Sequence, residues 1–369
     1  MVDPSQPSQL GSMPISFLGQ PIEHRDSLRA MLGRSEEQVA WVGDVTTYLK
    51  TAGRKGVGRV QRLWDQLGGT HDPNYLSYVL KTIDESATKL VIAFWGTTPL
   101  PDVVALKKQR PKVKIVFIVL CHPLAAEPMG VARQNFFMRR AARYLDGIIY
   151  PSQEMREYFN DRVLRRELPA AVIPPCWPAS FQSATRAAAV ADHPNLIYTG
   201  RTDFNGWGAQ ATDDTRPLMK ALLDAGIEIH HGSTPESEDG HPRRKTFKVV
   251  SLKGLIEMIG GYDASLIAYN TGAAKCDERF RFTVFDRLLT SVTAGVPIAI
   301  PKQGYAASKS YLREGGYPMI EFESPRDLHE ALSNRARMNE LRDQAWAARQ
   351  NYAAERHGPA LRKYLEQFL

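Results

Sequence analysis

Residues that could do chemistry gather between Lys275 and Thr290. Basic side chains alternate there with acids, and the members of the set are Lys275, Glu278, Arg279, Arg281, Asp286, Arg287 and Thr290. Arginine, lysine and helix N-termini all stabilise negative charge, so the stretch predicts a site for an anionic group such as a phosphate. The alternative interpretation is a plain loop, helix and strand of an α/β sheet.

This stretch continues into a helix and a strand with clear boundary signals. The helix carries Val284, Leu288 and Val292 and is expected to end at Gly295, because glycine takes the left-handed conformation without steric cost. Pro297 lies just beyond and cannot continue a helix. A buried strand follows, so the passage predicts part of an α/β sheet.

Three other expected strands end in residues suited to a binding site. Ligands of open α/β sheets lie beyond the carboxyl ends of the strands. One of the three strands ends at His122, one in Gly200 and Arg201, and one at Gly232. These four residues are therefore candidate ligand contacts.

The composition indicates an ordinary globular protein with more than one domain. The chain has 369 residues, of which 43% are hydrophobic and 24% charged, and this length exceeds what one core usually serves. Further apolar strand candidates at 37–44, 76–81 and 90–95 alternate with helical segments, which predicts parallel sheets covered by helices. Residues 1–20 are rich in Ser, Pro and Gln and are expected to be poorly ordered.

Charge and cysteine content exclude several classes. The net charge of +7 is compatible with nucleic acid, an anionic lipid surface or a phosphorylated substrate. No nucleic-acid-binding module is recognisable, so no nucleic-acid partner is expected. The three scattered cysteines argue against a disulfide framework and a metal site, and no cofactor is expected. Without a signal or transmembrane segment, the chain is expected to be cytoplasmic, with peripheral contact to the inner face of the membrane as a further option.

Several passages resemble the family 4 glycosyltransferases of the GT-B architecture. The resemblance rests on the Ala-Gly-Val-Pro that ends the helix at 294–297, the Gly200-Arg201 strand end, the Asp-Gly-Ile-Ile-Tyr-Pro-Ser at 146–152, and the glycine-bearing basic loop at 53–59. It implies an α/β fold of two facing Rossmann-like domains, with a C-terminal helix crossing back to the first. The implied boundaries are an N-terminal acceptor domain at 21–176, a linker at 177–192, a nucleotide-sugar domain at 193–345 and returning helices at 346–369.

The resemblance also assigns roles to residues. It implies that His122 contacts the donor sugar, that Gly200, Arg201 and Gly232 approach the donor, and that basic residues from Lys275 to Arg287 contact its phosphates. The lysine that the family usually carries a few residues after Arg201 is absent here. The loop with Gly56, Gly58 and Arg59 would face the acceptor.

Two registers compete for the acids that the family places around this helix. Glu278 and Asp286 have the usual separation, with Glu278 near the sugar and phosphate and Asp286 on the ribose. Alignment by the Ala-Gly-Val-Pro ending instead puts Phe282 at the first acid and Thr290 at the ribose. The first register is slightly favoured.

The implied function is transfer of a sugar from a nucleotide-diphosphate donor to a glycan, lipid or other acceptor, by a hexosyltransferase-like enzyme with a role such as polysaccharide biosynthesis. Retention and metal independence follow by analogy, since basic residues and helix N-termini would stabilise the leaving group. The alternative is a GT-B-like binding or regulatory subunit without turnover, which the missing lysine supports.

Overall fold

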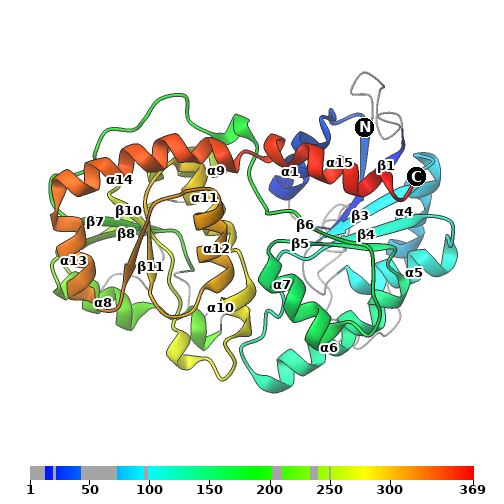
Figure 1. The fold of residues 1–369 in the computed structure, drawn as a ribbon, viewed down its shortest axis with the longest axis horizontal. Helices are drawn as coiled ribbons and strands as arrows, with labels where there is room; N and C mark the ends of the chain where they lie inside the picture. The colour runs from blue at the N-terminus through cyan, green and yellow to red at the C-terminus, as the bar shows by residue number, and fades with distance from the viewer. Residues whose placement is uncertain are drawn as a thin grey trace. The chain divides into compact units, whose positions relative to one another are not determined.

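The computed structural model describes residues 13–19, 22–42, 73–94, 99–201, 210–232, 240–248 and 251–369. The chain divides into two compact units (Figure 1). The first combines Met1–Pro175 with Ala354–Leu369, and the second is Cys176–Ala353.

The first unit is built on a six-stranded sheet in the order β2-β1-β3-β4-β5-β6, and every strand pair is parallel. Its strands are β1 (Ile15–Gly19), β2 (Val39–Val42), β3 (Leu90–Phe94), β4 (Lys114–Ile118), β5 (Gly147–Tyr150) and β6 (Ala170–Val172). The central strands are continuous apolar runs because helices cover both faces of the sheet.

Helices pack on the two faces of this sheet in separate groups. Neighbouring contacts join α4 (Pro73–Glu85), α5 (Leu100–Gln109) and α6 (Pro128–Ala141), while α1 (Ile22–Leu32) packs with α15 (Gly358–Glu366). The short helix α7 (Gln153–Tyr158) begins at Ser152, whose hydroxyl accepts a hydrogen bond from Met155 N. Two short turns follow these helices, η2 (Ala142–Tyr144) and η3 (Phe159–Val163).

The last helix belongs to the first unit, as the sequence predicted. Leu361, Tyr364 and Leu365 of α15 are buried, and the Tyr364 hydroxyl donates to the carbonyl oxygen of Pro169 at 2.8 Å. A Cβ atom on Gly147 would collide with the Tyr364 hydroxyl, so the glycine allows α15 to lie directly on β5.

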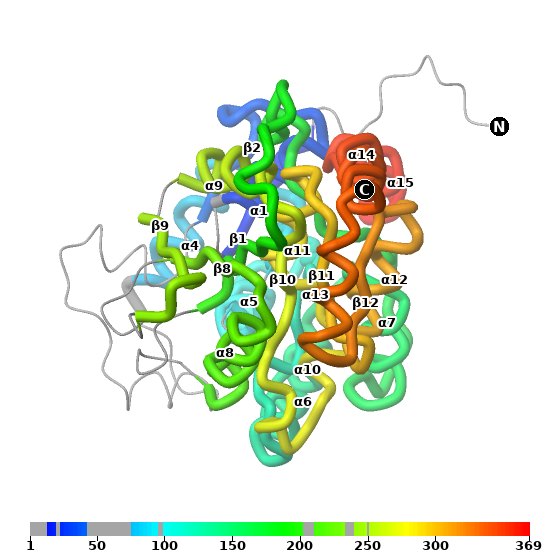
Figure 2. Tube along the Cα trace, turned by 90° about the vertical axis from the view of Figure 1, so that its left-hand side faces the viewer, coloured from blue at the N-terminus to red at the C-terminus, as the bar shows by residue number. Residues whose placement is uncertain are grey.

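The second unit holds a second parallel six-stranded sheet, in the order β12-β11-β10-β7-β8-β9. Figure 2 looks onto this unit, with β9 and β12 at its two edges. The strands are β7 (Asn195–Tyr198), β8 (Glu228–Gly232), β9 (Arg244–Phe247), β10 (Ala264–Leu266), β11 (Ile298–Pro301) and β12 (Met319–Phe322).

Helices again flank this sheet. One group joins α8 (Arg216–Asp224) to α13 (Pro325–Ser333) and α14 (Arg335–Ala348), and the other joins α9 (Leu252–Ile259) to α11 (Asp286–Ala294). The remaining helices are α10 (Glu278–Phe282) and α12 (Ala306–Glu314), and the short turns are η4 (Ala179–Phe181), η5 (Ala211–Asp213), η6 (Thr271–Ala273), η7 (Arg349–Tyr352) and, in the first unit, η8 (Ala354–His357). In the described part of the chain, no helix has the length and apolar character needed to cross a bilayer.

The helix stop predicted at Gly295 is confirmed. Gly295 has φ 73° and ψ 38°, and its N–H bonds back to the carbonyl of Val292, so α11 ends in a left-handed turn directly before β11.

Several sequence expectations were wrong. The region expected to be a poorly ordered leader contains β1, a fully buried strand. Residues 76–81 were expected to form a strand but lie inside α4, since Tyr75, Val79 and Ile83 are buried at helical spacing. The run at 242–248 has the basic composition that is typical of a solvated loop, but it contains the edge strand β9. The segment at 177–192 belongs to the second unit, as do residues 346–353.

Candidate functional site

The second unit has a topological switch point at the carboxyl end of its sheet. β7 and β10 are adjacent and parallel, and the strand order reverses between them, because β8 and β9 follow on one side while β11 and β12 follow on the other. Gly200 and Arg201 follow β7, and Tyr269 follows β10. Open α/β sheets bind ligands in the crevice at such a reversal.

Arg287, in the first turn of α11, lies at this switch point among aromatic rings. Its guanidinium carbon is 3.8 Å from the ring centre of Tyr269, 5.5 Å from that of Tyr198 and 5.9 Å from that of Phe285. The guanidinium interacts with the side chains of Tyr198 and Tyr269, but its buried Nη1 atom makes no hydrogen bond of ordinary geometry with a described residue. Since a buried donor without a partner is costly, this nitrogen is suited to an anionic ligand.

The side chains of Tyr198 and Arg287 also fill the space around Gly200. A Cβ atom there would collide with the Tyr198 ring and with Arg287 Nη1. The position therefore requires glycine whether or not a ligand is bound. Gly232 differs, because no described atom lies within 4 Å of the Cβ that a larger residue would carry.

The other basic candidates have different surroundings. Arg279 pairs with Asp213 at 3.3 Å, with both side chains largely buried, and stacks over Tyr269 at 5.2 Å. It therefore braces η5 against the aromatic rings. Arg201, Lys275 and Arg281 are exposed, and Arg281 Nε lies 3.9 Å from Asp277.

The acid candidates begin two successive helices. Glu278 is the first residue of α10 and is half-buried, and Asp286 is the first residue of α11 and is exposed. Thr290 is only 5% exposed, and its hydroxyl donates to the Asp286 carbonyl at 3.0 Å and accepts from Trp177 Nε1 at 3.2 Å. Both hydrogen-bonding roles of Thr290 are thus used internally.

An unusual backbone conformation supports the aromatic cluster. Tyr305 is fully buried with φ 59°, a region that bulky residues rarely adopt. Its hydroxyl accepts a 2.8 Å hydrogen bond from Tyr269 N, which fixes the loop after β10. Such strain persists only where the surroundings determine it, often near a functional site.

His122 lies in the first unit, after β4 and before a cis peptide bond to Pro123. Its ring is 1% exposed and makes an edge contact with Phe159 at 5.1 Å between ring centres. Burial lowers the pKa of His122 to about 4, although the 2.8 Å hydrogen bond from Nε2 to Asn135 Oδ1 opposes this shift. The imidazole is therefore neutral at pH 7 and can act as a hydrogen-bonding group but not as an acid.

Gly56, Gly58 and Arg59, assigned to the acceptor side, lie outside the described residues. In the described ranges, no three His, Cys, Asp or Glu side chains are arranged to hold a metal ion.

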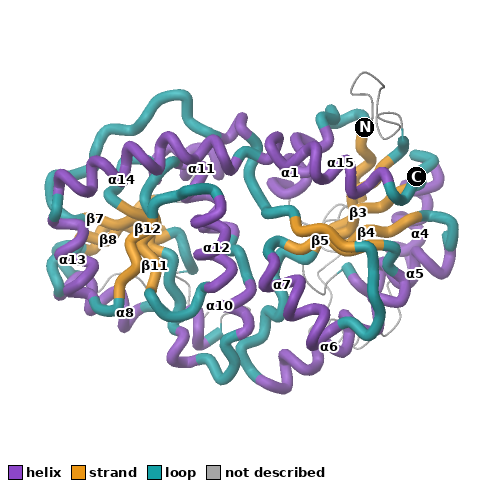
Figure 3. The backbone as a smooth tube through the Cα atoms, in the orientation of Figure 1, coloured by secondary structure: helices purple, strands orange, loops and turns teal. Residues whose placement is uncertain are grey.

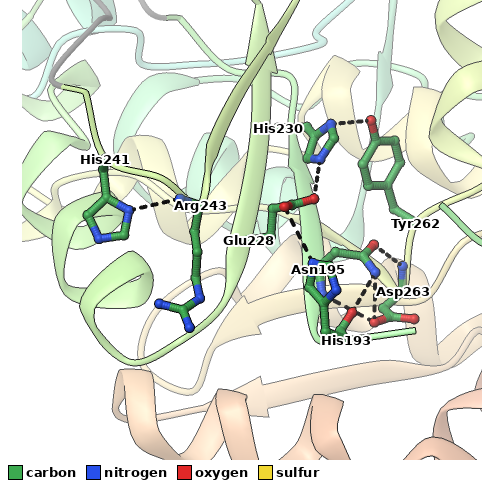
Figure 4. Close-up of polar contacts among 8 residues, drawn as sticks. All are labelled: His193, Asn195, Glu228, His230, His241, Arg243, Tyr262 and Asp263. Carbon is green, nitrogen blue, oxygen red and sulfur yellow. Dashed lines mark hydrogen bonds and ion pairs between the residues drawn. The ribbon is translucent and has the colours of Figure 1, made fainter. Parts of the chain in front are cut away.

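A second polar cluster lies at the amino edge of the second sheet (Figure 4). His230 bonds through Nε2 to Glu228 at 2.7 Å, and its Nδ1 lies 2.9 Å from the Tyr262 hydroxyl. Burial would raise the pKa of Glu228, but the contacts with His230 and His193 hold it below its usual value. Glu228 begins β8, and His193 and Tyr262 precede β7 and β10, so the cluster lies toward the edge opposite to Arg287 and holds β8 to the loop before β10.

Sequence reasoning missed the aromatic rings of the site and the partner of His122. Tyr198 and Tyr269 close two similar passages, Leu-Ile-Tyr and Leu-Ile-Ala-Tyr, and this repeat at two strand ends was a usable signal. Asn135, whose Oδ1 bonds to His122, is a polar residue on the inner side of a helix, which was a second signal.

The comparisons with known proteins concern structure alone. No model of a protein family and no curated protein matches the sequence. The structure is similar to HepE from Anabaena, with a TM-score of 0.61 and 14% identity over 96% of this chain and 99% of that one. It is also similar to sucrose-phosphate synthase from Thermosynechococcus elongatus (TM-score 0.63, 11% identity) and to trehalose 6-phosphate synthase from Burkholderia multivorans (TM-score 0.62, 11% identity), each over 96% of this chain and 98% of that one.

The chain has the GT-B fold. The predicted pair of Rossmann-like units, with the last helix returning to the first, is thereby confirmed. If the strands of the second unit are numbered 1 to 6 from β7 to β12, their order in the sheet is 3-2-1-4-5-6. This is the strand order of dinucleotide-binding sheets.

Proposed function

We propose that the protein is a glycosyltransferase that moves a sugar from a nucleotide-diphosphate donor to a glycan, lipid or other acceptor. The observation that carries this proposal is Arg287 at the switch point of the second sheet, enclosed by aromatic rings and with a buried Nη1 that makes no hydrogen bond of ordinary geometry in the described structure. The similar HepE was crystallised with UDP and glucose and with UDP-glucose, which agrees with a nucleotide-sugar donor.

Arg287 would take the place of the lysine that is missing after Arg201. The two arginines come from neighbouring elements, and Gly200, which directly precedes Arg201, is in close contact with Arg287 Nη1. Arginine offers a fork of donors to phosphate oxygens, and the positive end of the α11 dipole adds to the attraction. Together they would stabilise the charge on the departing nucleoside diphosphate without a metal.

The geometry favours Glu278 and Asp286 as the acids of the site. Asp286 is exposed beside Arg287, whereas the hydroxyl of Thr290 is buried and already bonded twice. Asp286 would accept from the ribose hydroxyls, and Glu278 would lie toward the sugar and phosphate. The proposal includes retention of the anomeric configuration of the transferred sugar and membership of glycosyltransferase family 4.

The experiment is calorimetric titration of the protein with UDP, GDP, ADP and CMP, with and without Mg²⁺. Arg287→Ala and Arg201→Ala should each lower the affinity for the nucleotide roughly tenfold to a hundredfold, because each removes a charged hydrogen-bond donor. Arg337→Ala is the matched control, since Arg337 is exposed on α14 and pairs with Glu340.

The outcomes separate the transferase from a subunit without turnover. Nucleotide binding followed by release of the nucleoside diphosphate from the matching sugar donor supports the transferase. Binding without turnover on any acceptor tested favours the regulatory subunit. If no nucleotide binds, or if Arg287→Ala binds as wild type, the site assignment fails.

A further inference from the structure

The helix α6 (Figure 3) and the turn η2 that follows it carry a stripe of exposed residues, which we call the α6 surface. Its members are spaced by four and three residues, and they are Met129, Arg133, Phe136 and Arg140 of α6 and Arg143 of η2. This spacing places them on one side of the helix. Met129 is 84% exposed and Phe136 is 55% exposed, which is unusual for large apolar side chains.

The charge of the α6 surface has one sign. From Pro128 to Leu145 the chain has four arginines and neither Asp nor Glu. Arg139 donates to the carbonyl oxygens of Arg162 and Val163 and so fastens α6 to η3. The exposed side chains of Arg162 and Arg165 extend the positive region, and the nearby acids Glu127 and Asp161 offset only part of it.

The arginines of the α6 surface differ from other exposed arginines of the chain. Arg313, Arg326 and Arg337 in the second unit each pair with a glutamate within 2.9 Å. Arg133, Arg140 and Arg143 form no ion pair within the described part of the chain. Their charge is therefore available to a partner.

The inner side of the same helix holds the loop of His122. Asn135 bonds to the His122 ring, and Gln134 Oε1 accepts from Leu124 N at 2.8 Å and from Ala125 N at 3.2 Å. The helix that carries the α6 surface therefore also holds the loop that follows β4.

We propose that the α6 surface docks the protein onto an anionic lipid bilayer. Arginines attract the negative headgroups, and the apolar Met129 and Phe136 enter the boundary between headgroups and acyl chains. A nucleic acid would complement the arginines but would leave both apolar side chains in water. An apolar protein groove would cover Phe136 but would leave the arginines unmatched.

The test is flotation of the full-length protein with vesicles of phosphatidylcholine alone and of phosphatidylcholine with phosphatidylglycerol. Wild type should bind the anionic vesicles and release them at high salt. R133Q/R140Q/R143Q should bind roughly a hundredfold more weakly. The matched control R313Q/R326Q/R337Q has the same net charge of +4 (7 − 3) and should bind as wild type.

Two further variants separate charge from insertion. M129S/F136S should reduce binding to anionic vesicles, whereas Val190→Ser, at a 45% exposed valine of the second unit, should not. R133K/R140K/R143K should retain binding, and nucleotide titration of every variant should match wild type, so that this result is independent of the proposed donor site.

The proposal is overturned if wild type does not float with anionic vesicles, or if the two glutamine variants lose binding equally. Binding of a duplex oligonucleotide through the α6 arginines in the absence of vesicle binding would also overturn it, in favour of a nucleic-acid partner.

Discussion

At the scale of single residues, Arg287 of the second unit is the side chain best placed to bind a phosphate. A guanidinium enclosed by Tyr198, Tyr269 and Phe285 keeps its charge but loses most of its water. The rings hold the side chain in one place, so an arriving phosphate would meet a donor that is already oriented. This preorganisation reduces the entropy lost on binding.

Gly200→Ala should disturb this arrangement. The new Cβ would press on Tyr198 and Arg287, which are held by the surrounding rings, and overpacking of this kind costs about 1–3 kcal/mol. We expect a lower melting temperature and weaker nucleotide binding. Gly232→Ala is the control, because its Cβ would meet no described atom, and it should leave stability within about 0.5 kcal/mol of wild type. Equal effects of the two changes would contradict this account of Gly200.

His122 should make the first unit sensitive to acid. Its pKa is about 4 in the folded chain and about 6.5 when unfolded, so the unfolded chain takes up the proton first as the pH falls. Protonation of His122 therefore does not affect the free energy of unfolding above pH 6.5. Between pH 6.5 and pH 4 it lowers this free energy progressively, by up to about 3 kcal/mol. Urea unfolding of wild type and His122→Gln over this range should give a steeper decline for wild type. Parallel profiles would refute the assignment.

At the scale of elements, the two ends of α11 determine the position of the candidate site. Its first residues present Asp286 and Arg287, and its left-handed end at Gly295 returns the chain directly into β11. A longer helix would displace β11 from its place between β10 and β12.

Gly295→Ala should therefore destabilise the second unit. The left-handed conformation costs a non-glycine residue about 1–2 kcal/mol, and the new Cβ would lie 3.0 Å from both Arg349 Cδ and Trp346 Cε3. Thermal unfolding would show the loss. Gly272→Ala is the control, since the nearest described atom to its Cβ would be 3.7 Å away, and a comparable loss there would remove the special role of Gly295.

Elements with local signals could be predicted from the sequence, and those without could not. The helix stop at Gly295 and the cap at Ser152 depend on neighbouring residues alone. The strand expected at 76–81 failed because a short apolar run fits either a strand or a helix. β9 was missed because charged side chains on a sheet edge look like a solvated loop. The rings around Arg287 come from separate elements, and their assembly depends on sheet order.

At the scale of the whole molecule, the second unit is one continuous segment set between two parts of the first. Its two ends lie side by side, because Trp177 and Ala353 form a parallel bridge within that unit. The first unit, in contrast, takes its last helix from the far end of the chain.

Residues 176–353 produced alone should therefore fold and retain the nucleotide affinity of the full chain. The complementary change, a stop after Ala353, removes α15 and uncovers β5 and the Tyr364 contacts. Limited proteolysis with mass spectrometry should then show cleavage in the first unit and protection in the second. Cleavage of both units at equal rates would contradict the independence of the two cores.

The position of α15 also sets an order of events during synthesis. Domains usually fold from the N-terminus as the chain emerges from the ribosome. Here the first unit cannot complete its packing until residues 354–369 are translated, because α15 supplies the Tyr364 that packs against Gly147 and bonds to Ile148 O. The second unit has all of its residues before that moment, so the half of the protein that is made later is the first that can finish folding.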